Sequence, residues 1–208
     1  MEIIADGLAK RYRTHWVFRD MSLTIPSGSK TGITGPNGSG KSTLLKVLSG
    51  ALPPSQGKVH YRLRDREIPL SDIFRYVSFA APYVDLIDEM TVAESVQFHR
   101  RFRKLKRGLD LSGVLEALGS HFRATTAIHE MSSGMKQRMR LALALCSEAE
   151  ILLLDEPTTN LDDQGQQWFH TMLNEWCGTE TLLIASNDAA DMAACTNWIR
   201  LPDYAPPS

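Results

Sequence analysis

The chain contains the stretch "GPNGSGKST" at residues 35–43, and this stretch carries its clearest structural signal. It follows "KTGIT" at 30–34, which is typical of a strand, and runs into "STLLKVL" at 42–48, which has apolar residues at helical spacing. Glycines between a strand and a helix let backbone N–H groups turn towards a phosphate without Cβ clashes. The pattern G-x-x-x-x-G-K-[S/T] in this setting predicts a phosphate-binding loop.

Each part of this loop has an expected chemical role. The helix begins near Lys41 and directs the positive end of its dipole at the bound phosphates. Lys41 is expected to reach the β- and γ-phosphates, and the Ser42 hydroxyl to ligate Mg²⁺. The alternative is a purely structural glycine turn, and the complete motif in its setting argues against it. The residues expected to hold the phosphates of a bound nucleotide here are Gly35, Pro36, Asn37, Gly38, Ser39, Gly40, Lys41, Ser42 and Thr43.

Two adjacent carboxylates follow the continuous apolar run in "ILLLDEP", residues 151–157. Such a run is typical of a central strand in a parallel sheet. Asp155, at its end, is expected to hold the Mg²⁺ through water. Glu156 is expected to accept a proton from a water that attacks the γ-phosphate, which makes it the catalytic base.

Strands and helices alternate along the rest of the chain, which predicts an α/β fold with a parallel sheet covered by helices. Strands are expected over 2–7, 17–25, 30–34, 57–62, 75–79, 151–157, 181–186 and 197–201. Helices are expected over 41–52, within 91–118, and over 132–146, 163–177 and 189–196.

The segment 83–146 shows no clear strand, so it is interpreted as an inserted helical subdomain. The core is then formed by 1–82 and 147–208 of a single domain. The tail from Pro202 is too rich in proline to continue as helix or strand.

Composition excludes several classes of protein. The formal net charge is −1, so nothing global indicates an electrostatic nucleic-acid binder. The three cysteines match no metal or redox motif and fit a reducing compartment, with Cys146 expected as a small buried apolar residue. No signal peptide and no apolar run of about 20 residues is present, so we expect a soluble chain whose membrane role comes through a partner.

These residues resemble the ATP-binding cassette (ABC) ATPases over nearly the whole chain. The stretch "MSSGMKQR" at 131–138 is similar to the family signature L-S-G-G-Q, since Ser132 and Gly134 match while Met131, Ser133 and Met135 depart. "PTTNLD" at 157–162 is similar to the D-loop, with Asp162 at its acidic position. Tyr12 occupies the place where the family stacks an aromatic ring on adenine, and Trp16 is the competing candidate.

The resemblance implies a P-loop fold with an ABC-type core, an N-terminal antiparallel β element and the helical insertion. It implies a Mg²⁺-dependent ATPase in which two cassettes dimerise head to tail. Ser132, Ser133 and Gly134 of one copy would then face the γ-phosphate bound by the other. The implied location is cytoplasmic, at the inner face of a membrane.

Two departures from the family pattern bear on activity. The family carries a Gln where the core meets the insertion, and here Ala81 or Pro82 stands near that place. The family carries a His that contacts the γ-phosphate after the strand 181–186, and here the aligned residue is Asn187. Asn187 is still expected to take part in catalysis. An amide can donate a hydrogen bond but carries no charge. Losing a contact of this kind can cost roughly 10²–10³ in rate, by analogy with single oxyanion donors. We expect a slow ATPase, and the alternative is a nucleotide-gated switch with little turnover.

The favoured use of the cassette is as the energy-coupling subunit of a membrane transporter with a separate transmembrane partner. The candidate docking residues Tyr83, Val84, Leu86 and Ile87 could equally pack a subdomain interface. The other use is a soluble ABC ATPase in DNA maintenance, translation or metal-cluster assembly. The basic run 99–108 could touch nucleic acid or face anionic lipid headgroups. It is interpreted as the solvated face of a helix, so no nucleic acid is expected. The apolar side of that helix is expected to hold Val96, Phe98, Phe102 and Leu105.

Overall fold

The computed structural model describes residues 1–205, with Arg107 described by its backbone alone. The chain forms two compact units. The first contains Met1–Phe79, Ala149–Glu156 and the described chain from Thr179 onward; the second contains Ala80–Glu148 and Pro157–Gly178. The expected insertion 83–146 thus lies within the second unit, which also includes 157–178.

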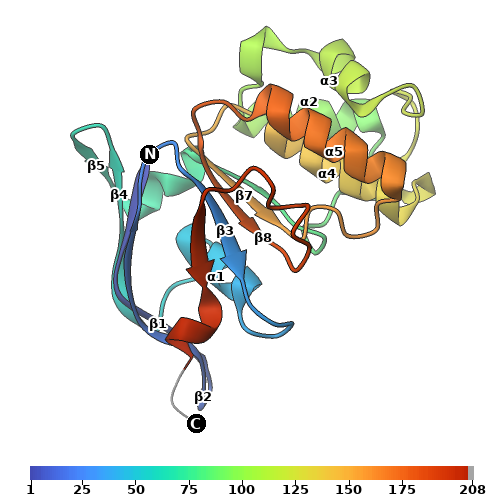
Figure 1. Ribbon diagram of the computed structural model, residues 1–208. Coiled ribbons are helices and arrows are strands. Elements are labelled where there is room, and N and C mark those ends of the chain that lie inside the picture. Colours follow the sequence, from blue (N-terminus) through green and yellow to red (C-terminus); the bar gives the residue numbers. More distant parts are fainter. Residues whose placement is uncertain (206–208) are drawn as a thin grey trace. The chain divides into compact units, whose positions relative to one another are not determined.

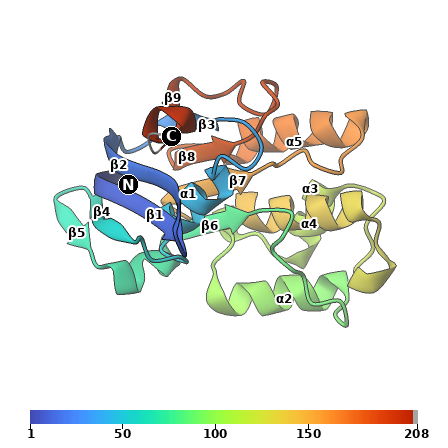
Figure 2. The ribbon, with the colours of Figure 1, turned by 90° about the horizontal axis from the view of Figure 1, so that it is seen from below.

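The first unit contains two sheets (Figures 1 and 2). An antiparallel sheet has the order β2 (His15–Ile25), β1 (Glu2–Tyr12), β4 (Gln56–Leu63) and β5 (Arg66–Ile68). A second sheet has the order β6 (Val77–Ala80), β7 (Ile151–Asp155), β8 (Thr181–Ala185), β3 (Lys30–Thr34) and β9 (Asn197–Arg200). Strand β3 pairs in parallel with β8 and β9, and β7 pairs in parallel with β8. The predicted mostly parallel sheet and N-terminal antiparallel element are confirmed.

Helix α1 (Lys41–Leu48) supplies a buried apolar face to the core of this unit. Leu44, Leu45 and Leu48 are fully buried there together with Ile33 of β3. This packing fixes the position of the helix end that follows the phosphate loop.

The second unit is built from four helices: α2 (Val92–Phe102), α3 (Leu111–Leu118), α4 (Ser133–Leu145) and α5 (Asp163–Trp176). Thr91 starts α2 with a capping box, because its hydroxyl accepts from Glu94 N and the Glu94 carboxylate accepts from Thr91 N. Helices α4 and α5 lie beside one another (Figure 1).

The helix predicted over 189–196 is wrong, because this segment forms consecutive turns. Its backbone bonds span three residues, such as Met192 N to Ala189 O. The polar side chains explain the difference. The Asp188 carboxylate accepts from Ala190 N at 2.8 Å, and buried Asp191 accepts from Ser186. These local bonds compete with a regular helix.

The four residues expected on one apolar side of the helix with the basic run, Val96, Phe98, Phe102 and Leu105, differ in burial. Val96 and Leu105 are buried, but Phe98 is 41% and Phe102 is 74% exposed. The two rings pack edge to face on each other, with centroids 5.1 Å apart. They lie four residues apart on α2, which places them on one helix face, outside the buried stripe of Val92 and Val96.

All three cysteines are buried, and burial raises the pKa of the Cys146 thiol to about 11. Cys146 therefore has the expected character of a small apolar residue. Leu201–Tyr204 forms a short 3₁₀ turn within the proline-rich tail, and residues 206–208 of that tail lie outside the described chain. Among the described residues, no helix is both long and apolar enough to cross a bilayer.

Candidate functional site

The phosphate loop lies between β3 and α1, as predicted. Gly40, the loop residue directly before α1, caps this helix with φ at 102°, a left-handed conformation that favours glycine. A Cβ atom at this position would also collide with the Val17 side chain. The loop can therefore make its turn into α1 only with glycine at position 40.

Lys41 is the first residue of α1 and is buried, with 6% of its surface exposed. Its ammonium group donates to Gly35 O at 2.9 Å and to Asn187 Oδ1 at 2.9 Å. Its Nζ atom also lies 3.7 Å from Glu156 Oε1. The three residues expected to act in catalysis, Lys41, Glu156 and Asn187, are thus brought together.

Asn187 follows β8 and contacts the phosphate loop through both atoms of its amide. Its Oδ1 accepts from Lys41, and its Nδ2 donates to Asn37 Oδ1. The side chain at the family's His position is therefore bonded directly to two loop residues.

Asp155 is the last residue of β7 and is buried, as predicted. Glu156 has φ at 44°, the left-handed region that is uncommon for a residue with a side chain. Its backbone N–H donates to Ala185 O at 2.7 Å, which holds this conformation. Burial raises the pKa of the Glu156 carboxyl, nearby Asp155 raises it further, and the Lys41 charge opposes the change.

Two residues at this site were missed by the sequence analysis. Ser186 Oγ donates to Asp191 Oδ2 at 2.6 Å and lies 3.4 Å from Glu156 Oε2. Ser186 and Asp191 are 1% and 2% exposed. A polar residue directly after a buried strand was the available signal for Ser186. Nothing local indicated that Asp191 would be buried beside it.

The loop and the neighbouring strand end fit a nucleotide phosphate group with Mg²⁺. Ser39 Oγ is buried and, within the described chain, has no hydrogen-bond partner, so a hydroxyl donor is available in the loop. Ser42 and Asp155 supply oxygen ligands of the kind Mg²⁺ prefers, and Mg²⁺ usually takes only one or two protein ligands besides phosphates and water. Across the described residues there is no cluster of three or more His, Cys, Asp or Glu side chains that could form a metal cage.

The two candidates for adenine stacking differ in what surrounds them. Trp16 has the guanidinium groups of Arg11 and Arg19 at 5.2 and 4.7 Å from its ring centroid. Tyr12, at the end of β1, is 50% exposed, with Lys10 Nζ 5.4 Å from its ring centroid. The Tyr12 ring therefore has fewer cations against it than the Trp16 ring and is the better candidate for stacking on adenine.

The signature residues lie in the second unit, at the start of α4. Ser132 caps this helix, since its hydroxyl accepts from Met135 N at 3.2 Å, and both Ser132 and Ser133 are exposed. Gly134 lies against the 157–162 segment, because a Cβ atom there would come within 2.8 Å of Asn160 O.

Asp162, the acidic residue of the 157–162 segment, caps α5. Its Oδ1 accepts from Gly165 N at 2.8 Å. The residue thus has a structural role that the resemblance alone did not indicate.

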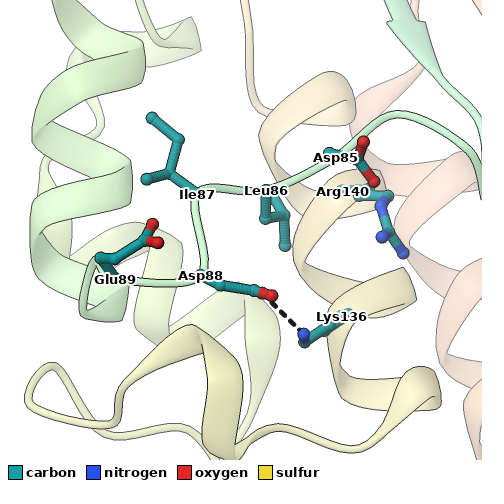
Figure 3. A pocket seen from close by; sticks show the side chains of 7 residues that line it. All are labelled: Asp85, Leu86, Ile87, Asp88, Glu89, Lys136 and Arg140. Carbon is teal, nitrogen blue, oxygen red and sulfur yellow. Dashed lines mark hydrogen bonds and ion pairs between the residues drawn. The ribbon is translucent and has the colours of Figure 1, made fainter.

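The second unit also has a pocket of about 390 Å³ ahead of α2 (Figure 3). Lys136 pairs with Asp88 at 2.7 Å across it, and Arg140 Nε donates to Val84 O at 2.5 Å. Tyr83, Val84 and Ile87 are exposed and Leu86 is partly exposed. The pocket is lined by Asp85, Leu86, Ile87, Asp88, Glu89, Lys136 and Arg140.

Comparisons with known proteins agree with this geometry. A family model described as ABC transporter matches residues 18–159, more than half of the chain. The zinc import ATP-binding protein ZnuC of Cereibacter sphaeroides is 34% identical over 94% of this chain and 79% of its own length. Nod factor export ATP-binding protein I of Rhizobium johnstonii is 34% identical over 77% of this chain, which spans only 52% of that relative.

A solved structure extends the likeness to three dimensions. The dimeric structure of a bacterial ABC transporter cassette is 26% identical, with a TM-score of 0.80 over 95% of this chain and 93% of that one. The phosphate loop, the Asp155–Glu156 pair and the signature segment all lie within the region matched by the family model. The chain therefore belongs to the ABC transporter family and has the fold of its ATP-binding cassettes.

Proposed function

We propose that this chain binds and hydrolyses ATP and thereby powers a membrane transporter. One observation carries the proposal. The ammonium group of Lys41, the carboxylate of Glu156 and the amide of Asn187 converge beside the phosphate loop. A cation for phosphate, a base for water and a polar group for positioning are the elements that phosphoryl transfer needs.

The residues have separate roles in this proposal. Backbone N–H groups of 35–43 and Lys41 hold the phosphates, and Tyr12 stacks on adenine. Ser42 and Asp155 hold Mg²⁺, which neutralises charge on the phosphates when bound. Glu156 accepts the proton of the attacking water. Its raised pKa makes its carboxylate a stronger base than an exposed glutamate.

A second copy of the chain completes each site. Ser132 and Ser133 are exposed beside Gly134, so they are accessible to the γ-phosphate bound by a partner cassette. A two-fold axis generates two identical sites from one self-complementary surface. The dimeric state of the solved bacterial cassette supports this arrangement.

The transport partner is a separate transmembrane subunit, which places the chain at the cytoplasmic face of the membrane. The exposed apolar residues Tyr83, Val84 and Ile87 adjoin the pocket ahead of α2. They offer the transmembrane subunit a docking surface. The named relatives include an importer and an exporter component, so the direction of transport is left to the partner. No nucleic-acid partner is proposed, because the net charge is −1.

A second candidate function is a nucleotide-gated switch that closes on ATP with little turnover. The observation favouring it is Asn187 itself, because an amide cannot take the charge of a histidine. A measurement of ATP turnover separates this switch from an ATPase that powers transport.

The dimer is tested with Glu156→Gln, which removes the base but keeps the size of the side chain. Sedimentation with ATP and Mg²⁺ is expected to show a dimer, while Lys41→Ala under the same conditions stays monomeric. A Glu156→Gln chain that is monomeric with ATP bound would contradict the head-to-tail arrangement.

A further inference from the structure

The amide of Asn187 has a defined orientation at the phosphate loop. Its Oδ1 is 2.9 Å from the Lys41 ammonium, which can only donate, and its Nδ2 donates to Asn37 Oδ1. Turning the amide over would place its N–H₂ group against the ammonium and leave both groups without an acceptor there. The lysine therefore determines which way the amide points.

The Lys41 ammonium has three donors, and the protein takes two of them. One goes to Gly35 O and one to Asn187 Oδ1, each at 2.9 Å. Glu156 Oε1, at 3.7 Å, is beyond hydrogen-bond distance. One donor is left for a phosphate oxygen while both contacts are kept.

The hydrogen bonds of Lys41 to Gly35 O and to Asn187 Oδ1 differ in how easily they can be broken. Gly35 O belongs to the backbone of the loop that must hold its shape around the phosphates. Asn187 is an exposed side chain that follows the end of β8. A second phosphate contact of Lys41 therefore displaces Asn187, whose Oδ1 then faces phosphate oxygens unless its amide rotates away from Asn37.

We propose that Asn187 is a specificity residue that favours nucleoside diphosphate over triphosphate, by holding a Lys41 donor that the γ-phosphate needs. This inference rests on the proposed nucleotide site. A diphosphate uses the one remaining donor of Lys41 and leaves the Asn187 bond intact. A triphosphate must break this bond, so Asn187 lowers the affinity for ATP relative to ADP.

The test replaces the amide without changing much else. Asn187→Leu keeps the approximate size and removes both hydrogen bonds, and Asn187→Ala is a second variant with less apolar surface. Asn37→Ala frees the Nδ2 group and lets the amide rotate. Asn197→Leu makes the same exchange at an exposed position of β9 and serves as the matched control.

The readout is binding, measured by competition of ADP and of the non-hydrolysable analogue AMP-PNP against a fluorescent ADP, with Mg²⁺ and dilute protein. In Asn187→Leu and Asn187→Ala, the ratio of the AMP-PNP to the ADP dissociation constant is expected to fall about three- to tenfold. Asn37→Ala is expected to lower it by less, and Asn197→Leu not at all.

An unchanged or increased ratio in both Asn187 variants would overturn this inference and leave the nucleotide site standing. If neither nucleotide competes with the fluorescent ADP in the unaltered chain, the proposed function fails as well.

Discussion

Lys41 is a buried cation, and its surroundings account for it. A buried ammonium is costly unless it is hydrogen-bonded or paired. Here it has two oxygen acceptors at 2.9 Å and the Glu156 carboxylate at 3.7 Å. The protein thus maintains a positive charge next to the loop in which phosphate is expected.

Replacing this lysine tests the binding role directly. Lys41→Ala is expected to weaken binding of ATP by at least about tenfold, because charge-assisted hydrogen bonds to phosphate are lost. Isothermal titration with a non-hydrolysable analogue measures the change. Lys46→Ala, at the other end of the same helix, is the control and should bind normally. Tight binding by the Lys41 variant would refute the phosphate-loop assignment.

Residues within one short motif were predictable, but contacts between distant residues were not. The loop 35–43 was predicted because its glycines, lysine and serine are adjacent and their chemistry is local. Asn187 was found through the resemblance, but its bond to Asn37 joins residues 150 positions apart. The Ser186–Asp191 pair joins residues only five positions apart, but the burial of both side chains depends on how the chain packs after β8.

At the scale of elements, the start of α4 depends on close approach to the segment that precedes α5. A Cβ atom at Gly134 would come within 2.8 Å of Asn160 O, closer than real contacts allow. Gly134→Ala is therefore expected to lower the free energy of unfolding by about 1–3 kcal/mol, and the melting temperature by several degrees. Ser133→Ala, at the exposed neighbouring position, should melt as the unaltered chain does. Equal melting of both variants would show that the backbone adjusts freely.

A histidine on α2 makes the stability of the fold depend on pH. His99 Nε2 lies 2.7 Å from Ser147 Oγ, which itself donates to Leu143 O, so the ring is the donor to Ser147. Burial lowers the pKa of His99 to about 4, and the Arg103 charge acts in the same direction. In the unfolded chain the pKa returns to about 6.5. Below pH 6.5 the unfolded chain therefore binds a proton that the folded chain excludes until about pH 4.

Stability is therefore expected to fall by about 2 kcal/mol between pH 7.5 and pH 5 on account of His99. Urea unfolding at the two pH values measures the change. His99→Gln, which keeps a donor for Ser147, should reduce the pH dependence by that amount, and His121→Gln, at an exposed position, should not. A pH dependence equal in all three proteins would contradict a neutral, partly buried His99.

The helices and strands themselves show where sequence patterns fail. The run 151–155 was predicted because apolar residues alone define a buried parallel strand. The helix over 189–196 failed because Asp188 and Asp191 bond to their own turn. The exposure of the Phe98–Phe102 pair was not predictable, because helical spacing predicts a shared face but not whether that face is covered.

For the whole molecule, the fold class was predictable and the partners were not. Alternation of strands and helices predicts a parallel sheet from one sequence. The proposed second copy and transmembrane subunit would contact this chain through exposed residues such as Ser132 and Ile87, and exposure alone does not identify a partner.

The most direct test of the account is hydrolysis of ATP by the purified chain with Mg²⁺, in steady state and in a single turnover, with Glu156→Gln as the blank. We predict turnover that is slow but clearly above the blank, because Lys41, Asp155 and Glu156 are in place. Turnover at the level of the blank, with ATP bound, would contradict the proposed ATPase and leave the nucleotide-gated switch as the function.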